Sequence, residues 1–178
     1  VAASAVVAAL VGAVAWKARP PASTPPVTRF SFALGEGQQF TNTGRQLVAL
    51  SPDGTQLVYV ANQRLYLRPL SGLKGLPIPG SESPGGITDP AFSPDGRFVA
   101  FFSATDRALK KIAVNGGAAV TLCPADYPFG MTWVADAVLF AEQRKGISRV
   151  SANGGDPEPI VTVRDGEVMY GPQLLPDG

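Results

Sequence analysis

Short apolar runs separated by turn-forming residues recur along most of the chain. Apolar positions alternate with polar ones or form solid runs at 55–61 (TQLVYVA), 97–104 (RFVAFFSA) and 137–142 (AVLFAE). Runs of this length, bounded by glycine, proline, asparagine and aspartate, are typical of β-strands rather than helices. The pattern therefore predicts an all-β chain in which short strands are joined by tight turns.

A Ser-Pro-Asp-Gly turn precedes two of these runs, at residues 51–54 and 93–96. The two turns lie 42 residues apart, and a further Pro-Asp-Gly contains Asp177, two periods of 41 residues beyond Asp95. The period predicts another turn near residue 136, where Asp136 stands without the flanking proline and glycine. Proline, aspartate and glycine each favour a turn, so we interpret Asp53, Asp95 and Asp177 as turn-forming rather than as metal or ligand contacts.

Each unit of 41–42 residues holds four predicted strands. A single four-stranded sheet with two apolar faces cannot bury either face alone, so repeated sheets stack around an axis, as in a β-propeller. We therefore predict a partial β-propeller over residues 27–178, with about three four-stranded blades and the start of a fourth at GPQLLP (171–176). Residues 27–34 (VTRFSFAL) are expected to form a strand that completes the last blade. Because the last unit is incomplete, the chain is expected to be a fragment.

Residues 1–16 (VAASAVVAALVGAVAW) are uncharged and mostly apolar. They are slightly fewer than the ~20 residues that span a bilayer, so we expect a truncated transmembrane helix with Trp16 at the headgroup level. Ala13-Val14-Ala15 also fits the end of a signal peptide, and a buried soluble helix is a third alternative. Residues 17–26 are proline-rich and predict an extended linker between the membrane and a folded domain.

Composition excludes several classes of chemistry. The chain has 15 Lys and Arg against 14 Asp and Glu, without a basic stripe, so we expect no nucleic-acid partner. The absence of histidine excludes a Ser-His-Asp triad and an HExxH zinc site within this chain. Cys123 ends an apolar run and is expected to be a buried structural thiol. Glu142, Asp165 and Glu167 show no spacing that would pair them, so no catalytic, cofactor or metal site is predicted and this chain is not expected to be an enzyme.

The segments ALSPDGTQLVYVA, LYLRPL, AFSPDGRFVAFFS and LKKIAVNGG resemble the TolB-type, WD40-like propeller repeat. The third unit departs from this repeat, because VAD replaces SPDG. The order of apolar segment, proline-rich linker and repeats is similar to the C-terminal half of bacterial membrane-anchored Ser/Thr protein kinases. That resemblance implies a single-pass protein of the bacterial cell membrane, with a sensing or protein-interaction propeller on the periplasmic side and a kinase domain before residue 1.

Two alternatives to the kinase setting stay open. The propeller would also suit a stand-alone TolB-like periplasmic scaffold protein, or the gating propeller of a prolyl-oligopeptidase-type serine peptidase. The chain itself has no kinase motif: there is no Gly-rich phosphate loop, no VAIK-type lysine, and no HRD or DFG.

Candidate binding residues lie in Asp126-Tyr127-Pro128-Phe129, in the predicted connection between the second and third blades. Propellers commonly bind partners at such connections, so Asp126, Tyr127 and Phe129 are the candidates for contact with a protein or small-molecule ligand of unknown identity. Phe92, Phe129 and Trp133 are also predicted to be core residues. Four basic residues fall on the third strands and are interpreted as solvated charges that protect sheet edges, namely Arg68, Lys110, Lys111 and Arg149.

Overall fold

The computed structural model describes residues 30–41, 44–143, 145–164 and 166–174. All of its strands belong to a unit that runs from Leu34 to Gly178. The first sheet contains β1 (Val48–Leu50), β2 (Gln56–Ala61), β3 (Arg64–Pro69) and β4 (Leu76–Pro77). The second contains β5 (Ile87–Phe92), β6 (Phe98–Ser103), β7 (Ala108–Ala113) and β8 (Val120–Pro124). The third contains β9 (Met131–Val134), β10 (Ala137–Glu142), β11 (Gly146–Ser151) and β12 (Glu158–Val161).

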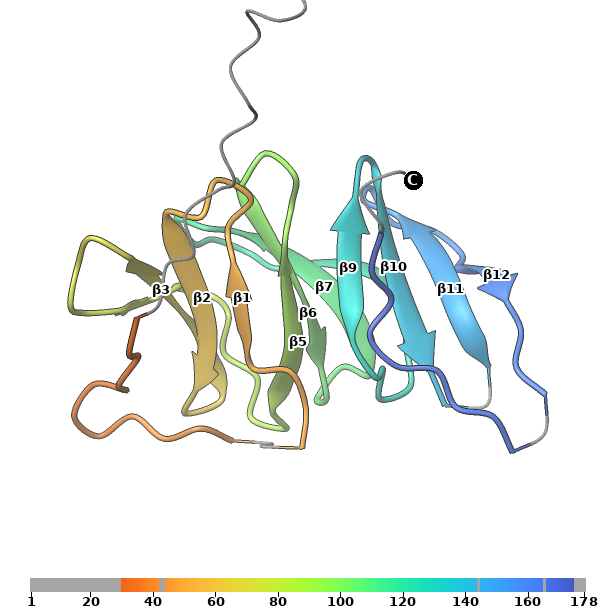
Figure 1. The fold of residues 1–178 in the computed structure, drawn as a ribbon, viewed down its shortest axis with the longest axis horizontal. Coiled ribbons are helices and arrows are strands. Elements are labelled where there is room, and N and C mark those ends of the chain that lie inside the picture. The colour runs from red at the N-terminus through yellow and green to blue at the C-terminus, as the bar shows by residue number, and fades with distance from the viewer. Residues whose placement is uncertain (1–29, 42–43, 144, 165, 175–178) are drawn as a thin grey trace, which may run out of the picture. The chain divides into compact units, whose positions relative to one another are not determined.

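Each sheet is an antiparallel meander whose strands pair in chain order. The first strands of the three sheets lie next to one another, β1 beside β5 and β5 beside β9, so that the sheets fan out from a common inner edge (Figure 1). This arrangement confirms the predicted all-β, partial β-propeller, and each sheet is one blade. The predicted period therefore corresponds to one blade.

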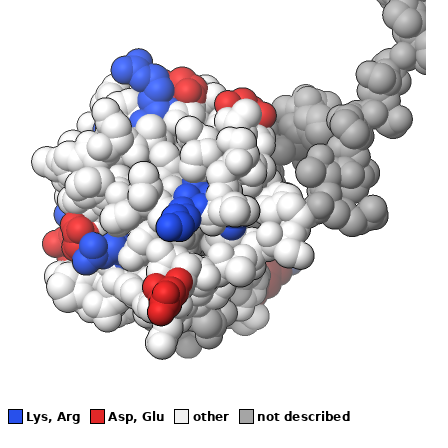
Figure 2. All heavy atoms as spheres, turned by 90° about the vertical axis from the view of Figure 1, so that its left-hand side faces the viewer, with Lys and Arg blue, Asp and Glu red and all other residues white. Residues whose placement is uncertain are grey.

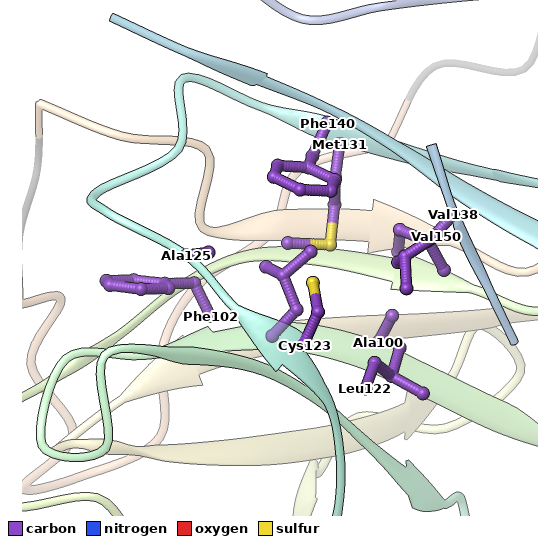
Figure 3. Packing of buried hydrophobic residues seen from close by; sticks show 11 residues of the cluster. Ala100, Phe102, Leu122, Cys123, Ala125, Met131, Val138, Phe140 and Val150 are labelled. Atoms are coloured by element: carbon purple, nitrogen blue, oxygen red, sulfur yellow. The ribbon is translucent and has the colours of Figure 1, made fainter. Parts of the chain in front are cut away.

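Apolar side chains fill the spaces between neighbouring blades. In β6, Phe101 packs into the cluster shared with the first blade and Phe102 into the cluster shared with the third. Successive strand residues point to opposite faces, so one strand contributes to both clusters. Figure 3 shows the cluster between the second and third blades, which we call the second cluster, in which the buried thiol of Cys123 lies among aliphatic and aromatic side chains. The predicted core position of Phe92 is confirmed, whereas Trp133 packs against the second cluster and stays partly exposed.

The Ser-Pro-Asp-Gly turns join the two inner strands of a blade, as predicted. Gly54 N–H donates to Ser51 O at 2.9 Å, and Gly54 has a φ of 68°, a conformation that favours glycine. The Ser51 hydroxyl and then the Thr55 amide and hydroxyl donate to the Asp53 carboxylate, and these bonds lower the Asp53 pKa to about 2. The second turn repeats this geometry, since the Ser93 hydroxyl donates to Asp95 at 2.6 Å. The turn-forming interpretation is therefore confirmed for both described acids, and Asp177 lies outside the described residues.

The third inner turn, where VAD replaces SPDG, keeps the reversal with fewer residues. Val134 pairs directly with Ala137, so only Ala135 and Asp136 form the loop. Ala135 has a φ of 49°, which L-residues other than asparagine and aspartate rarely adopt. The strands are thus in place, but the turn contains a locally strained alanine.

Backbone bonds also link each blade to the next. The glycine turn after β7 contacts the end of the first blade, since Gly117 N–H donates to Pro79 O at 3.0 Å. The matching turn after β11 contacts β8, since Gly155 N–H donates to Leu122 O at 3.0 Å. The same contact thus recurs at the next blade junction, so the corresponding glycine turns help to pack neighbouring blades together.

The basic residues of the third strands have a different role from the one predicted. The third strand of each blade lies between the second and the fourth, so it is not a sheet edge. Lys111 Nζ donates across the blade junction to Ala152 O at 2.6 Å, and Arg68 Nε donates to Gly72 O at 3.0 Å. Lys110 pairs with Asp106 at 2.8 Å and Arg149 with Asp136 at 3.5 Å. The interpretation of these four residues as edge-protecting charges was therefore wrong.

Two predicted strands differ in the structure. Residues 30–34 and 171–174 are irregular, so the described part of VTRFSFAL and of GPQLLP contains no strand. Gly171 N–H still donates to Phe129 O, next to the start of β9, but Pro172 has no N–H with which to extend a ladder. Residues 1–16, 17–26 and Asp165 lie outside the described residues. No helix in the described ranges is long and apolar enough to cross a membrane.

Candidate functional site

The predicted binding residues lie in the connection from β8 to β9, before the lower end of β9 in Figure 1. This end of the blades carries the hairpins between second and third strands, whereas the Pro-Asp-Gly turns lie at the other end. Asp126 and Tyr127 are exposed there, and Phe129 is half-buried. The structure thus brings all three residues to one face, which we call the connection face.

Arg45, which the sequence analysis did not select, holds Phe129 in place. The Arg45 guanidinium carbon lies 3.8 Å from the centre of the Phe129 ring, and Nη1 donates to Pro128 O at 3.2 Å. The Phe129 ring also meets the Tyr170 ring edge-on, with 5.0 Å between the ring centres. Phe129 therefore belongs to the surface layer and not to either core cluster, which corrects its prediction as a core residue. Arg45 precedes β1, 83 residues before Pro128, and no local pattern links the two positions.

Tyr127 stands out by its backbone and its exposure. Its φ is 49°, in the left-handed region, and the residue is 52% exposed. The ring lies 5.5 Å from Phe102 in a tilted contact, so the buried core supports one side of it. A bulky residue in this conformation is strained, and such strain concentrates at sites that bind or switch.

Charged groups fix the backbone around Tyr127. Arg107 Nη2 contacts Asp126 Oδ1 at 2.7 Å. Glu142 is 5% exposed, and its Oε1 accepts the Asp126 N–H at 2.6 Å and the Lys145 ammonium at 3.1 Å. Glu142, for which the sequence indicated no paired carboxylate, is therefore a structural anchor for the connection. Glu167 accepts the Arg164 N–H at 2.9 Å and is not among these residues.

Two hollows lie side by side on the connection face and share Arg45 and Tyr127 as lining residues. The larger hollow has a volume of about 390 Å³, and the other about 270 Å³. Besides the two shared residues, the larger is lined by Asp126, Phe129, Gln143 and Lys145. The smaller is lined by Gly44, Gly85, Thr88, Phe102 and Ala104. The larger hollow is thus polar and charged, whereas the smaller one has mostly small or apolar walls.

Asp89 is a buried carboxyl behind this face, in a bulged part of β5. It is 2% exposed, its φ is 57°, and the β5–β6 register shifts between Thr88 and Ala91. Its Oδ2 has no hydrogen-bond partner within the described ranges. Burial raises the Asp89 pKa to about 6, although the Thr88 hydroxyl and the charge of Arg45 act in the opposite direction. An aspartate inside a strand whose other residues are mostly apolar was the sequence signal for this feature.

A wider groove of about 800 Å³ lies along the inner strands β1, β5 and β9 and residues 171–174. Its described lining residues are all uncharged and include Pro52, Pro90, Pro94 and Pro172. The face shown in Figure 2 carries scattered Lys, Arg, Asp and Glu without a patch of one sign. No cluster of three metal-binding side chains occurs in the described part of the chain. The connection face is therefore the surface where charged, aromatic and strained groups converge.

Comparison with known proteins concerns the fold. No protein-family model and no curated protein matches the chain. Among solved structures, hydrazine synthase of Kuenenia stuttgartiensis is 17% identical with a TM-score of 0.59, over 82% of this chain and 44% of that one. YCF48 from Cyanidioschyzon merolae is 13% identical with a TM-score of 0.50, over 70% of this chain and 39% of that one. TolB from Acinetobacter baumannii is 15% identical with a TM-score of 0.47, over 63% of this chain and 33% of that one.

The chain thus spans less than half the length of each of these structures. At such low identity the first two likenesses support the fold alone. The class that the fold defines is a β-propeller, described here over three blades, with the connection face as its candidate site.

Proposed function

We propose that the chain is a binding propeller that recognises a protein partner through its connection face and performs no chemistry itself. The observation that carries the proposal is Tyr127, an aromatic side chain held half-exposed in a strained backbone conformation between two hollows. Tyrosine and arginine are enriched among residues that dominate binding energy at protein interfaces. Tyr127 and Arg45 supply this pair.

The face is organised before any partner binds. Phe102 supports the Tyr127 ring, Phe129 supports the Arg45 guanidinium, and the buried Glu142 fixes the backbone of Asp126. Side chains that are already ordered lose less entropy on association, which favours binding.

The proposed setting is the extracytoplasmic, ligand-sensing half of a membrane-anchored bacterial Ser/Thr protein kinase. The order of apolar segment, proline-rich linker and propeller repeats supports it. The coding sequence upstream of Val1 tests this setting, and we expect a kinase domain there. A signal peptide alone would instead favour the periplasmic scaffold, and a GxSxG motif downstream would favour the peptidase.

Co-purification of the intact protein from its native host tests the binding role. Tyr127→Asp places a charge at the centre of the face and is expected to release bound protein partners. Asn115→Asp is the matched control, because Asn115 is exposed in the turn after β7, at the opposite end of the blades. Equal co-purification by both variants would show that the connection face does not bind the partner.

A further inference from the structure

We propose that the connection face selects a partner segment that carries an acidic side chain next to an aliphatic one. This inference rests on the proposed binding role and adds the chemistry of the partner. The acidic group would enter the larger hollow, and the aliphatic group would enter the smaller hollow on the other side of Tyr127.

The larger hollow offers more hydrogen-bond donors than acceptors. Arg45 uses one described donor, Nη1, for Pro128 O, and Lys145 donates to Glu142, which leaves other N–H groups of both cations available. The carboxylate of Asp126, which lines the same hollow, is already paired with Arg107 at 2.7 Å. The side chain of Glu142 is 6% exposed, so a partner cannot readily reach it.

Arg45 is placed to accept a carboxylate. Its guanidinium carbon lies 3.8 Å from the centre of the Phe129 ring, and this contact restrains the guanidinium, which lines the hollow. A fixed guanidinium binds a carboxylate through two parallel hydrogen bonds, and such charge-assisted bonds are the stronger ones in proteins. A neutral amide in the same place lacks the charge and presents only one oxygen.

The smaller hollow fits an apolar side chain. Phe102 and Ala104 supply apolar surface, and Gly44 and Gly85 leave its walls open. A Cβ at Gly85 would lie 2.8 Å from the Thr105 nitrogen, so a larger residue at this position would need a backbone shift. With a volume of about 270 Å³, this hollow is below the usual range for small-molecule pockets and suits one side chain.

The two hollows share their dividing wall, so one partner segment can occupy both. Arg45 and Tyr127 line each of them. Neighbouring side chains of an extended peptide point to opposite sides of its backbone, so two side chains of one segment can enter two adjoining hollows. We therefore expect binding to need both groups on one short segment.

Saturation-transfer NMR with the intact protein and synthetic peptides tests this inference. The probes are acetylated, amidated peptides in which Leu and Glu are separated by zero, one or two Gly. Their matched controls replace Glu with Gln or Leu with Ser. We expect saturation of the Leu methyl protons for at least one Leu–Glu spacing, and about tenfold weaker binding for its Gln and Ser controls.

Variants of the protein locate the interaction. Arg45→Lys keeps the charge but loses the fork of N–H groups, and Lys145→Gln removes the second cation. Each variant is therefore expected to bind the Leu–Glu peptide more weakly than the wild type does, with no change in binding of the Gln control peptide. Tyr127→Ala is expected to abolish saturation, while Asn115→Ala leaves it unchanged. Thermal melts of each variant identify loss of folding. If Arg45→Lys fails to fold, Lys145→Gln still tests the role of the cations in the larger hollow.

Equal binding of the Glu and Gln peptides, or no binding of any Leu–Glu peptide, would overturn the proposed acidic selectivity. If Tyr127→Asp still releases the co-purified partner in that case, the binding role stands and only the partner chemistry is wrong. If Tyr127→Asp leaves co-purification unchanged, the binding role itself is wrong.

Discussion

At the residue scale, two unusual side chains lie at or near the connection face. Tyr127 and Asp89 both have a φ in the left-handed region. Tyr127 lines a hollow together with Arg45, and the positive charge of Arg45 acts on the Asp89 carboxyl. Asp89 is buried with one oxygen unpartnered within the described ranges, a condition that destabilises its ionised form. A fold that keeps such groups gives up stability at these positions, as proteins commonly do at functional sites.

The ionisation of Asp89 predicts a pH dependence of stability. Its pKa is about 6 in the folded protein against an ordinary value of 3.8, so the folded state holds the proton more tightly. The free energy of unfolding therefore falls as pH rises from about 4 to about 6, by up to about 3 kcal/mol, and is level above that range. Asp89→Asn cannot titrate and should be more stable than the wild type at pH 7 and similar at pH 4.

Denaturant unfolding of both proteins from pH 4 to pH 7 measures this difference, in which the other titrating groups cancel. Parallel pH profiles for the wild type and Asp89→Asn would show that Asp89 is ionised normally in the folded protein.

At the element scale, the inner turn of each blade depends on side chains that satisfy the backbone. In the second blade, the Ser93 hydroxyl accepts the Phe98 N–H at 2.9 Å and donates to Asp95. The same bonds occur in the first blade, where Ser51 accepts the Gln56 N–H at 2.9 Å. The serine thus joins the turn to the strand that follows.

Replacing this serine should destabilise the protein. Ser93→Ala leaves the Phe98 amide without its partner in a largely buried site, which costs about 1–3 kcal/mol. Ser71→Ala is the control, since Ser71 is exposed in the turn between β3 and β4 and its replacement should change stability by less than about 0.5 kcal/mol. Thermal or denaturant unfolding compares them, and equal effects would contradict the role of the Ser93 hydroxyl.

The third inner turn predicts the opposite outcome. Ala135 has a φ of 49°, which glycine adopts without a steric penalty. Ala135→Gly should therefore raise the free energy of unfolding by about 0.5–1 kcal/mol. Ala118→Gly, at an exposed position that lacks a positive φ, should lower it instead, and the same unfolding measurement checks both changes. A loss of stability in both variants would contradict the strain at Ala135.

At the scale of the whole molecule, the sequence predicted the blades well because it contains two regular patterns of different length. The two-residue alternation places strand residues on opposite faces, and the 41–42-residue repeat places each blade. The site was predicted only in its contiguous part, Asp126 to Phe129. Arg45, Arg107 and Lys145 join it from three other segments, and only the stacking of blades brings them together.

Stacking also predicts how local changes spread. Lys111 Nζ bridges the second and third blades by its bond to Ala152 O, whereas Lys110 pairs with Asp106 within its own hairpin. Lys111→Met should speed amide exchange in β11 and β8, on both sides of the junction. Lys110→Met should affect only the hairpin between β6 and β7, and hydrogen–deuterium exchange by mass spectrometry separates the two. Identical exchange patterns would contradict the bridging role of Lys111.

Recognition of a protein partner through the connection face is tested most directly by photo-cross-linking in living cells of the native host. A photoreactive phenylalanine analogue is placed at position 127 in one version of the intact protein and at position 115 in another. We predict a discrete cross-linked protein adduct from position 127 and none from position 115. An adduct from position 115 alone, or equal adducts from both positions, would contradict binding at the connection face.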